Sequence, residues 1–284
     1  MSYDILESDF NKKLSTAYQL SILIGMDSLV YFAFDTNNNN ALLLRAIPYA
    51  QAPGSDAFSL TDELKKIFAR EDLLGYLFRR VKITMPDIQP VLVPARLYNE
   101  YEKTTYFSEL MGQGRADAIQ NDEVEELALQ ILYPTDPALM AVLKKQFPTA
   151  KFYNTTTPYL LGCRKSLNEA QTHNLYAHFT QKNVYISLFE KKNLLFSNSF
   201  KYQTAGDVLY YILLTYNQHN LDPAQQPLNL SGQILSNAEI FKTLYRYIGE
   251  LKFVPFPSFL NFSRKFNDLP PHFYFDLFSL ALCK

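Results

Sequence analysis

Histidine and cysteine are residue types that often hold metal ions or act as nucleophiles, and this chain of 284 residues contains few of them. Its four histidines are His173, His178, His219 and His272. None forms the His-Glu-x-x-His pattern that binds zinc on a helix, and the two cysteines, Cys163 and Cys283, are too distant to form a local metal signature. We therefore predict no metal site, a hydrogen-bonded structural role for His178 and a buried Cys163 thiol.

Phosphate-binding loops and serine nucleophiles also lack a local signature. The nine glycines form neither Gly-x-x-x-x-Gly-Lys nor Gly-x-Gly-x-x-Gly, the patterns that bring backbone amides against phosphates. The segment Gly112-Gln113-Gly114-Arg115 lacks a third glycine and follows a predicted helix, so we interpret it as a flexible connection. No serine lies in a Gly-x-Ser-x-Gly turn. Local motifs alone identify no catalytic residue.

Composition excludes several classes of protein. The 27 Lys and Arg residues balance 28 Asp and Glu, so no strong field attracts nucleic acid, and basic pairs such as Arg79-Arg80 are dispersed. We do not expect nucleic-acid binding. No stretch approaches the ~18 apolar residues of a membrane helix, and residues 1–16 do not form a signal peptide. With only two cysteines, we expect a cytoplasmic protein without a membrane span.

Alternating hydrophobic residues predict two copies of one structural unit. The first copy has predicted strands at 18–24, 29–34 and 41–47 and a helix over 60–69. The second has predicted strands at 174–179, 184–189 and 193–199 and a helix over 205–219. A constant offset of 155 residues aligns Leu20 with Leu175 and Phe34 with Phe189. Three antiparallel strands followed by alternating helices and strands predict a mixed sheet with helices on its faces.

Further elements continue each copy. We predict strands at 90–93, 127–133, 227–230 and 251–254, and helices over 96–111, 137–146, 237–248 and 271–282. The polar segment 112–123 is predicted to be a surface loop, and the acidic cluster that begins at Asp122 a solvated helix start.

Three junctions resemble the actin, sugar kinase and heat-shock chaperone superfamily. Val93-Pro94-Ala95 is similar to its strand-to-helix junction, 150–162 to its crossing helix, and 229–232 to the strand that ends beside the adenosine. A family of uncharacterised bacterial proteins with an actin-like ATPase fold is the nearest resemblance. It implies an α/β protein with two tandem ribonuclease H-like domains, each a mixed five-stranded sheet flanked by helices. The implied domains are 1–155 and 173–284, with the crossing helix near 156–172.

The resemblance also implies where ATP chemistry would occur, and there the sequence departs from the superfamily. The second phosphate hairpin of the superfamily reads DLGGGTFDVSLL, whereas this chain places His178 at the aspartate and Thr180-Gln181-Lys182 at the glycines. In the first hairpin Leu23 replaces the metal-binding aspartate, and Gly25 is the one glycine retained. Thr157 replaces the glutamate of the crossing helix. The acidic and flexible elements that hold magnesium and triphosphate are therefore missing.

We interpret the chain as a non-catalytic actin-like binding or scaffold protein that does not hydrolyse ATP, with no cofactor or metal and with a protein partner. The alternative is a divergent ATPase or kinase that binds Mg-ATP through Asp27, Ser28 and Lys182, because lysine can hold phosphate without a glycine loop. In either case the implied ligand site is the interdomain cleft. The candidate cleft residues are Gly25, Asp27, Ser28, His178, Thr180, Lys182, Ser231 and Gly232.

Overall fold

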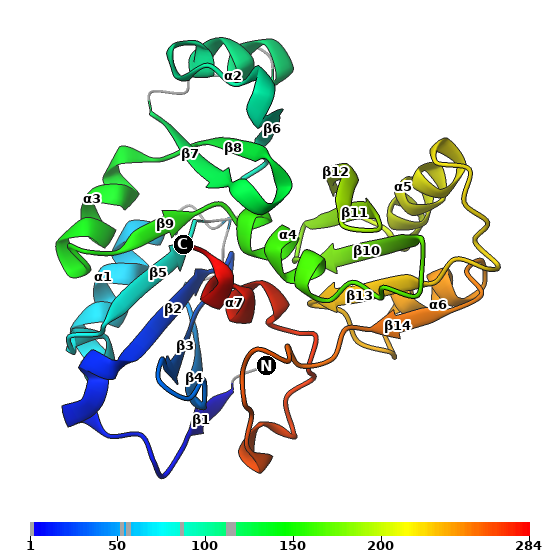
Figure 1. Ribbon diagram of the computed structural model, residues 1–284. Helices are drawn as coiled ribbons and strands as arrows, with labels where there is room; N and C mark the ends of the chain where they lie inside the picture. The colour runs from blue at the N-terminus through cyan, green and yellow to red at the C-terminus, as the bar shows by residue number, and fades with distance from the viewer. Residues whose placement is uncertain (1–2, 52–53, 55–57, 86–87, 112–117) are drawn as a thin grey trace. The chain divides into compact units, whose positions relative to one another are not determined.

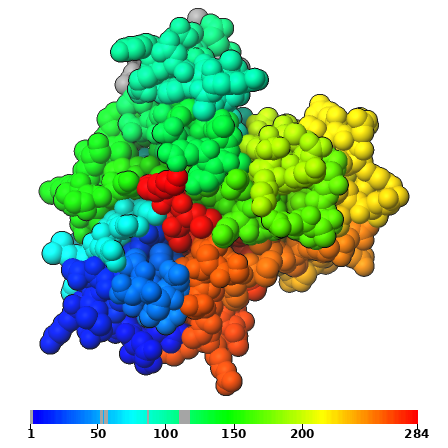
Figure 2. Space-filling view, in the orientation of Figure 1, coloured from blue at the N-terminus to red at the C-terminus, as the bar shows by residue number. Residues whose placement is uncertain are grey.

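The computed structural model describes residues 3–51, 54, 58–85, 88–111 and 118–284 (Figure 1). The chain divides into two compact units, and its C-terminal part contributes to both. The first unit is Met1–Pro158 with Ser258–Asp268 and Leu280–Lys284, and the second is Tyr159–Pro257 with Leu269–Ser279. In the first unit, orange C-terminal residues lie against blue N-terminal ones (Figure 2), where Asn261 bridges to Asn40 and Ser263 donates to Glu7. No helix of the described residues is long and apolar enough to cross a membrane.

The first unit is built on a six-stranded mixed sheet with the order β1-β4-β3-β2-β5-β9. Its strands are β1 (Asp4–Leu6), β2 (Tyr18–Ile24), β3 (Ser28–Asp35), β4 (Ala41–Pro48), β5 (Arg80–Thr84) and β9 (Lys151–Tyr153). Strands β1 to β4 pair antiparallel, whereas β5 and β9 run parallel to β2. The helices are α1 (Leu60–Arg70), which Ser59 caps, and α3 (Pro137–Gln146), which Asp136 caps.

A small antiparallel sheet in the first unit corrects two predictions. Its strands are β6 (Val91–Pro94), β7 (Ile119–Val124) and β8 (Leu129–Pro134), in the order β6-β8-β7, and α2 (Lys103–Met111) follows β6. Residues 119–123 are therefore strand, not loop; residues 112–117 lie outside the described part. The polar sequence of β7 does not predict a strand, because β7 is stabilised by its pairing with β8. The predicted helix over 96–111 begins only at Lys103, after two short 3₁₀ turns.

The second unit contains a five-stranded sheet with the order β12-β11-β10-β13-β14. Its strands are β10 (His173–Phe179), β11 (Asn183–Glu190), β12 (Asn193–Lys201), β13 (Leu228–Gly232) and β14 (Leu251–Phe253). Its helices are α5 (Ala205–Gln218), α6 (Glu239–Tyr245) and α7 (Phe275–Ser279), and α4 (Thr156–Lys165) leads into it. The predicted capping box at the start of α5 is confirmed, since Thr204 and Asp207 bond each other's backbone amides. The predicted terminal helix over 271–282 is shorter, because residues Leu280–Leu282 form a 3₁₀ turn.

The predicted duplication is confirmed by strand order and register. The order β4-β3-β2-β5-β9 in the first sheet corresponds to β12-β11-β10-β13-β14 in the second. Tyr18 pairs with Asp35 across β2 and β3, and His173 pairs with Glu190 across β10 and β11, so the offset of 155 holds between paired residues as well. Strand β1 extends the first sheet at the β4 edge. Each unit is therefore a mixed sheet with helices, as the α/β prediction requires.

Candidate functional site

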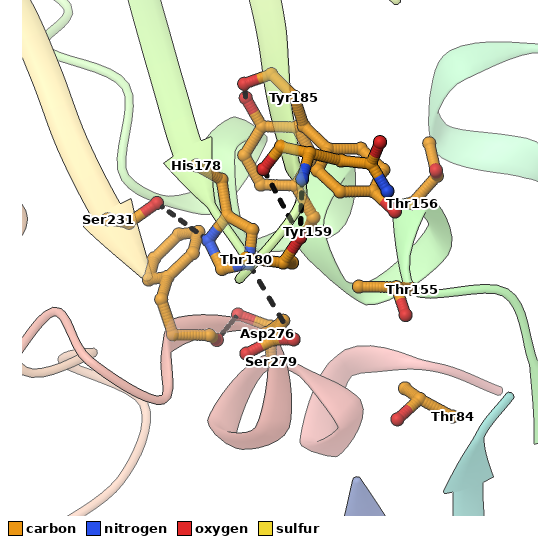
Figure 3. A network of polar contacts seen from close by, with 12 residues as sticks. Thr84, Thr155, Thr156, Tyr159, His178, Thr180, Tyr185, Ser231, Asp276 and Ser279 are labelled. Carbon is orange, nitrogen blue, oxygen red and sulfur yellow. Dashed lines mark hydrogen bonds and ion pairs between the residues drawn. The ribbon is translucent and has the colours of Figure 1, made fainter. Parts of the chain in front are cut away.

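His178 is held in a buried network inside the second unit. Because β10 and β13 run parallel in register, His178 lies directly beside Ser231, and its Nδ1 is 3.0 Å from the Ser231 Oγ (Figure 3). Its Nε2 is 3.7 Å from Oδ2 of Asp276 on α7. The rings of Tyr159 and Tyr185 lie 5.2 and 6.0 Å from the imidazole. As predicted, His178 is buried and hydrogen-bonded.

Serine, histidine and aspartate are the residue types of a hydrolytic triad, but this set is not built for catalysis. The exposed fractions of Ser231, His178 and Asp276 are 0%, 1% and 3%, so a substrate cannot reach the serine hydroxyl. The three residues come from β13, β10 and α7, and sequence spacing therefore could not associate Asp276 with His178. The network positions α7 against the sheet of the second unit.

The turn between β10 and β11 uses its own polar groups. The Thr180 amide donates to the Asn183 carbonyl over 2.9 Å, and the Asn183 amide donates to the Thr180 Oγ1 over 3.1 Å. Tyr202 donates its hydroxyl to the Thr180 carbonyl and its amide to the Lys182 carbonyl. The Lys182 side chain is exposed. Two amides of the turn that could bind a phosphate are thus already bonded within the protein.

Gly232 is required by backbone packing. Its φ is +82°, and a Cβ placed there would lie 2.1 Å from the Phe179 carbonyl oxygen. The amide of Gly232 donates to the His272 carbonyl, and the next amide, of Gln233, donates to the Phe179 carbonyl. The glycine therefore allows β13 to approach β10, and no open space is left at its Cα.

The corresponding turn of the first unit carries one carboxylate. The Gly25 amide donates to the Ser28 carbonyl over 2.9 Å, the same bond as in the turn 155 residues later. The Ser28 hydroxyl donates to the Asp27 Oδ1 over 2.9 Å. Tyr49 fixes the backbone, since its hydroxyl donates to the Gly25 carbonyl and its amide to the Asp27 carbonyl. The predicted residues Gly25, Asp27 and Ser28 therefore lie in one hydrogen-bonded turn.

Asp122 is a buried carboxylate in the first unit, and the prediction that it belongs to a solvated helix start is wrong. Tyr133 donates to its Oδ1 over 2.9 Å, while the Asn154 amide and the Thr157 Oγ1 donate to its Oδ2 over 2.8 and 2.5 Å. Burial raises the Asp122 pKa to about 7, although these three donors oppose the rise. The polar sequence around it offered no signal, because the contact with Thr157 joins residues 35 positions apart.

Comparison with known proteins shows the family of this chain and its fold. Residues 7–251 match the model of a family described as a protein of unknown function, DUF3822. The chain belongs to the DUF3822 family. Its structure is similar to that of a Bacteroides thetaiotaomicron protein with an actin-like ATPase fold and unknown function, with 22% identity and a TM-score of 0.80. The alignment covers 97% of this chain and 99% of that chain. This member of DUF3822 therefore has an actin-like ATPase fold.

A second solved structure is similar at lower identity. It is the PilM-PilN type IV pilus biogenesis complex, with 12% identity, a TM-score of 0.57, and coverage of 93% of this chain and 97% of that chain. No curated protein matches the chain. These likenesses establish the fold that the resemblance implied, and the chemistry of this DUF3822 member has to be argued from its own residues.

Those residues do not fit Mg-ATP bound in the manner of the superfamily. Magnesium requires oxygen ligands, yet the apolar Leu23 and the hydrogen-bonded His178 occupy the aspartate positions that the resemblance implied. Within the part of the chain that the structure describes, no group of three or more His, Cys, Asp or Glu residues could hold a metal ion. The oxygen ligands that the resemblance implied at these two positions are therefore replaced by Leu23 and His178.

Proposed function

We propose that this chain is a cytoplasmic, non-catalytic actin-like protein that binds a protein partner as a scaffold and does not hydrolyse ATP. The observation that carries the proposal is the buried network at His178. The imidazole is hydrogen-bonded to Ser231 and lies 3.7 Å from the Asp276 carboxylate, at the position where the resemblance implies a magnesium-binding carboxylate. A buried histidine held in this way can stabilise the fold, and its ring supplies no oxygen ligand to a cation.

The edge of the second sheet supports the proposed protein partner. In the first sheet β1 pairs with the outer edge of β4, whereas β12, the counterpart of β4, is the last strand of its sheet among the described residues. Strand β12 spans nine residues, and Leu195 on it is 47% exposed. An extended segment of a partner could pair with this edge as β1 pairs with β4. The similar PilM fold occurs in a complex with PilN, which agrees with this reading by analogy.

Phosphate release from Mg-ATP tests the absence of hydrolysis. We expect no phosphate above the protein-free control over hours at micromolar protein, because neither turn offers the ligands that position magnesium and triphosphate. Magnesium-dependent ATP binding accompanied by phosphate release would contradict the proposal.

Partner binding is tested at β12. The variant Leu195→Lys/Ser197→Lys adds charge to the edge strand, whereas Lys144→Gln/Lys145→Gln changes α3 and serves as a control. A partner captured with purified wild-type protein should be lost with the edge variant and retained with the control. Equal capture by the edge variant would place the partner elsewhere and contradict the proposed edge.

Asp122 favours the alternative, a divergent ATPase or kinase. The resemblance places the glutamate that orients the attacking water at Thr157, and the Asp122 carboxylate lies within 2.5 Å of the Thr157 hydroxyl. A carboxylate with a pKa near 7 has the proton affinity of a general base. If phosphate release is detected, Asp122→Asn should reduce its rate about a hundredfold or more. An unchanged rate in that variant would leave no role for Asp122 in hydrolysis.

A further inference from the structure

A strongly basic pocket lies in the first unit, and none of its lining residues is a candidate cleft residue. Its volume is about 400 Å³, within the range of small-molecule sites. Five cationic side chains and one hydroxyl residue line it, namely Arg79, Arg80, Lys82, Lys151, Lys284 and Thr149. Arg80 begins β5 and Lys151 begins β9, so the pocket is at the amino ends of these parallel strands. The turn at Gly25 follows the carboxyl end of β2, which pairs with β5, so it lies at the opposite end of these parallel strands.

The arrangement of cations in this pocket is costly without a ligand. Lys82 and Lys151 are direct cross-strand partners, and Arg80 lies two residues before Lys82 on the same face of β5. Like charges directly opposite each other on neighbouring strands destabilise a sheet. An unfavourable arrangement of like charges is typical of a binding site, where the ligand supplies the opposite charge.

The protein itself neutralises little of this charge. The buried Lys82 ammonium donates to the main-chain carbonyls of Leu280 and Cys283, which carry no net charge. Among the described residues, Arg80, Lys82 and Lys151 have no carboxylate within ion-pair distance. Lys284 differs, because it pairs with Glu125 and Glu126. Burial lowers the Lys82 pKa to about 8; interaction with Cys283 opposes this fall, and the positive charges of Arg80 and Lys151 contribute to it.

We propose that this basic pocket binds a small anion that carries two or more phosphate groups. Arginine presents a planar set of N–H donors that matches phosphate oxygens, lysine adds point charges, and Thr149 adds a hydroxyl. The total positive charge of Arg80, Lys82 and Lys151 is larger than the single negative charge of a monoanion. A concave volume near 400 Å³ favours a compact ligand over nucleic acid, which needs an extended basic track.

Calorimetric titration of the full chain with inorganic phosphate, pyrophosphate and tripolyphosphate in low-salt buffer tests this proposal. We expect saturable binding whose affinity rises with the number of phosphates. The exposed double variant Arg80→Gln/Lys151→Gln should weaken tripolyphosphate binding by roughly a hundredfold, about tenfold for each lost charged contact. The control Lys144→Gln/Lys145→Gln removes two exposed cations of α3 in the same unit and should bind as the wild type does. Circular dichroism verifies that both variants are folded.

Three outcomes would overturn the proposal. They are the absence of saturable heat with tripolyphosphate, equal weakening in the control variant, and tighter binding of a short oligothymidine that the Arg80→Gln/Lys151→Gln variant abolishes. The last outcome would assign the pocket to nucleic acid. Magnesium-dependent ATP binding that persists in the Arg80→Gln/Lys151→Gln variant would be assigned to the candidate cleft residues and not to the basic pocket. This result would contradict the proposed function and leave the proposed anion binding by the pocket intact, so the two proposals can fail separately.

Discussion

Asp122 and Gly232 show how single residues in this fold are constrained by atoms distant in the sequence. Asp122 is a buried carboxylate that accepts hydrogen bonds from Tyr133, Asn154 and Thr157. Gly232 leaves room for a carbonyl oxygen of the neighbouring strand. Each can be tested by a change of one functional group.

Replacing Asp122 with asparagine should change how stability depends on pH. Because the folded-state pKa of about 7 lies above the ordinary value, the folded chain binds the proton more tightly than the unfolded chain. The stabilisation is complete below about pH 4 and is lost as the pH rises to about 7, at up to ~1.4 kcal/mol per pH unit. Urea unfolding across this range should show that slope in the wild type and not in Asp122→Asn.

The neighbouring exposed Glu123 supplies the control for this measurement. Glu123→Gln changes a carboxylate on the same strand, β7, and should keep the wild-type slope. Equal slopes in wild type and Asp122→Asn would show that burial does not raise the pKa of this carboxyl group.

Gly232→Ala should destabilise the protein by about 3 kcal/mol or more, because the added Cβ meets the Phe179 carbonyl oxygen and the φ of +82° strains an alanine. Thermal unfolding measures the loss. Gly75→Ala is the control, since its Cβ would meet nothing within 4 Å, and it should change stability by less than about 1 kcal/mol. Similar stability of the two variants would contradict the close approach of β13 to β10.

At the scale of elements, helix α4 shows how packing overrides helix propensity. Gly162 lies within α4, where alanine would be favoured intrinsically by about 1 kcal/mol. A Cβ at this position would lie 2.2 Å from the Ser279 Oγ and 2.8 Å from the Phe275 Cζ, both on α7. The glycine therefore sets the distance between α4 and α7 in the second unit.

The variants Gly162→Ala and Gly206→Ala separate these two effects. Gly162→Ala should lower the free energy of unfolding by about 1–3 kcal/mol through overpacking, despite its better propensity. Gly206 lies in α5, and its nearest neighbour would be 3.5 Å from the new Cβ, so alanine there should be neutral or stabilising. Chemical denaturation measures both, and a stabilised Gly162→Ala variant would show that α7 can move away at little cost.

At the scale of the whole molecule, residues near the C-terminus pack on a sheet that begins near the N-terminus. The segment Leu280–Lys284 belongs to the first unit, where its carbonyls accept bonds from Lys82 and Gln19, and Tyr153 donates to the Lys284 carbonyl. These side chains come from three different strands, β5, β2 and β9. Hydrogen bonds from the sheet thus hold the segment, together with the buried side chains of Leu280 and Cys283.

Lys82→Met should loosen this segment. Loss of a charged donor to two carbonyls should increase amide hydrogen exchange over residues 280–284 by about tenfold or more, since bonds to charged groups contribute about 1.5–3 kcal/mol. Peptide-resolved exchange measures the change, and Lys144→Met on α3 should leave it unaltered. Unchanged protection in Lys82→Met would mean that other contacts hold the segment.

The amino-acid sequence by itself determined the duplicated units and the position of most strands, because side-chain alternation is a local property and the second copy repeats it 155 residues later. The actin-like ATPase fold was implied by the resemblance at three junctions. The sequence also selected Ser231, Gly232 and His178 as candidate cleft residues, and the structure places them on neighbouring strands. Only the tertiary structure decided that Asp276 joins His178, that Asp122 meets Thr157, and that Lys82 and Lys151 face each other. These contacts depend on which strands and helices become neighbours, and chain spacing does not encode that choice.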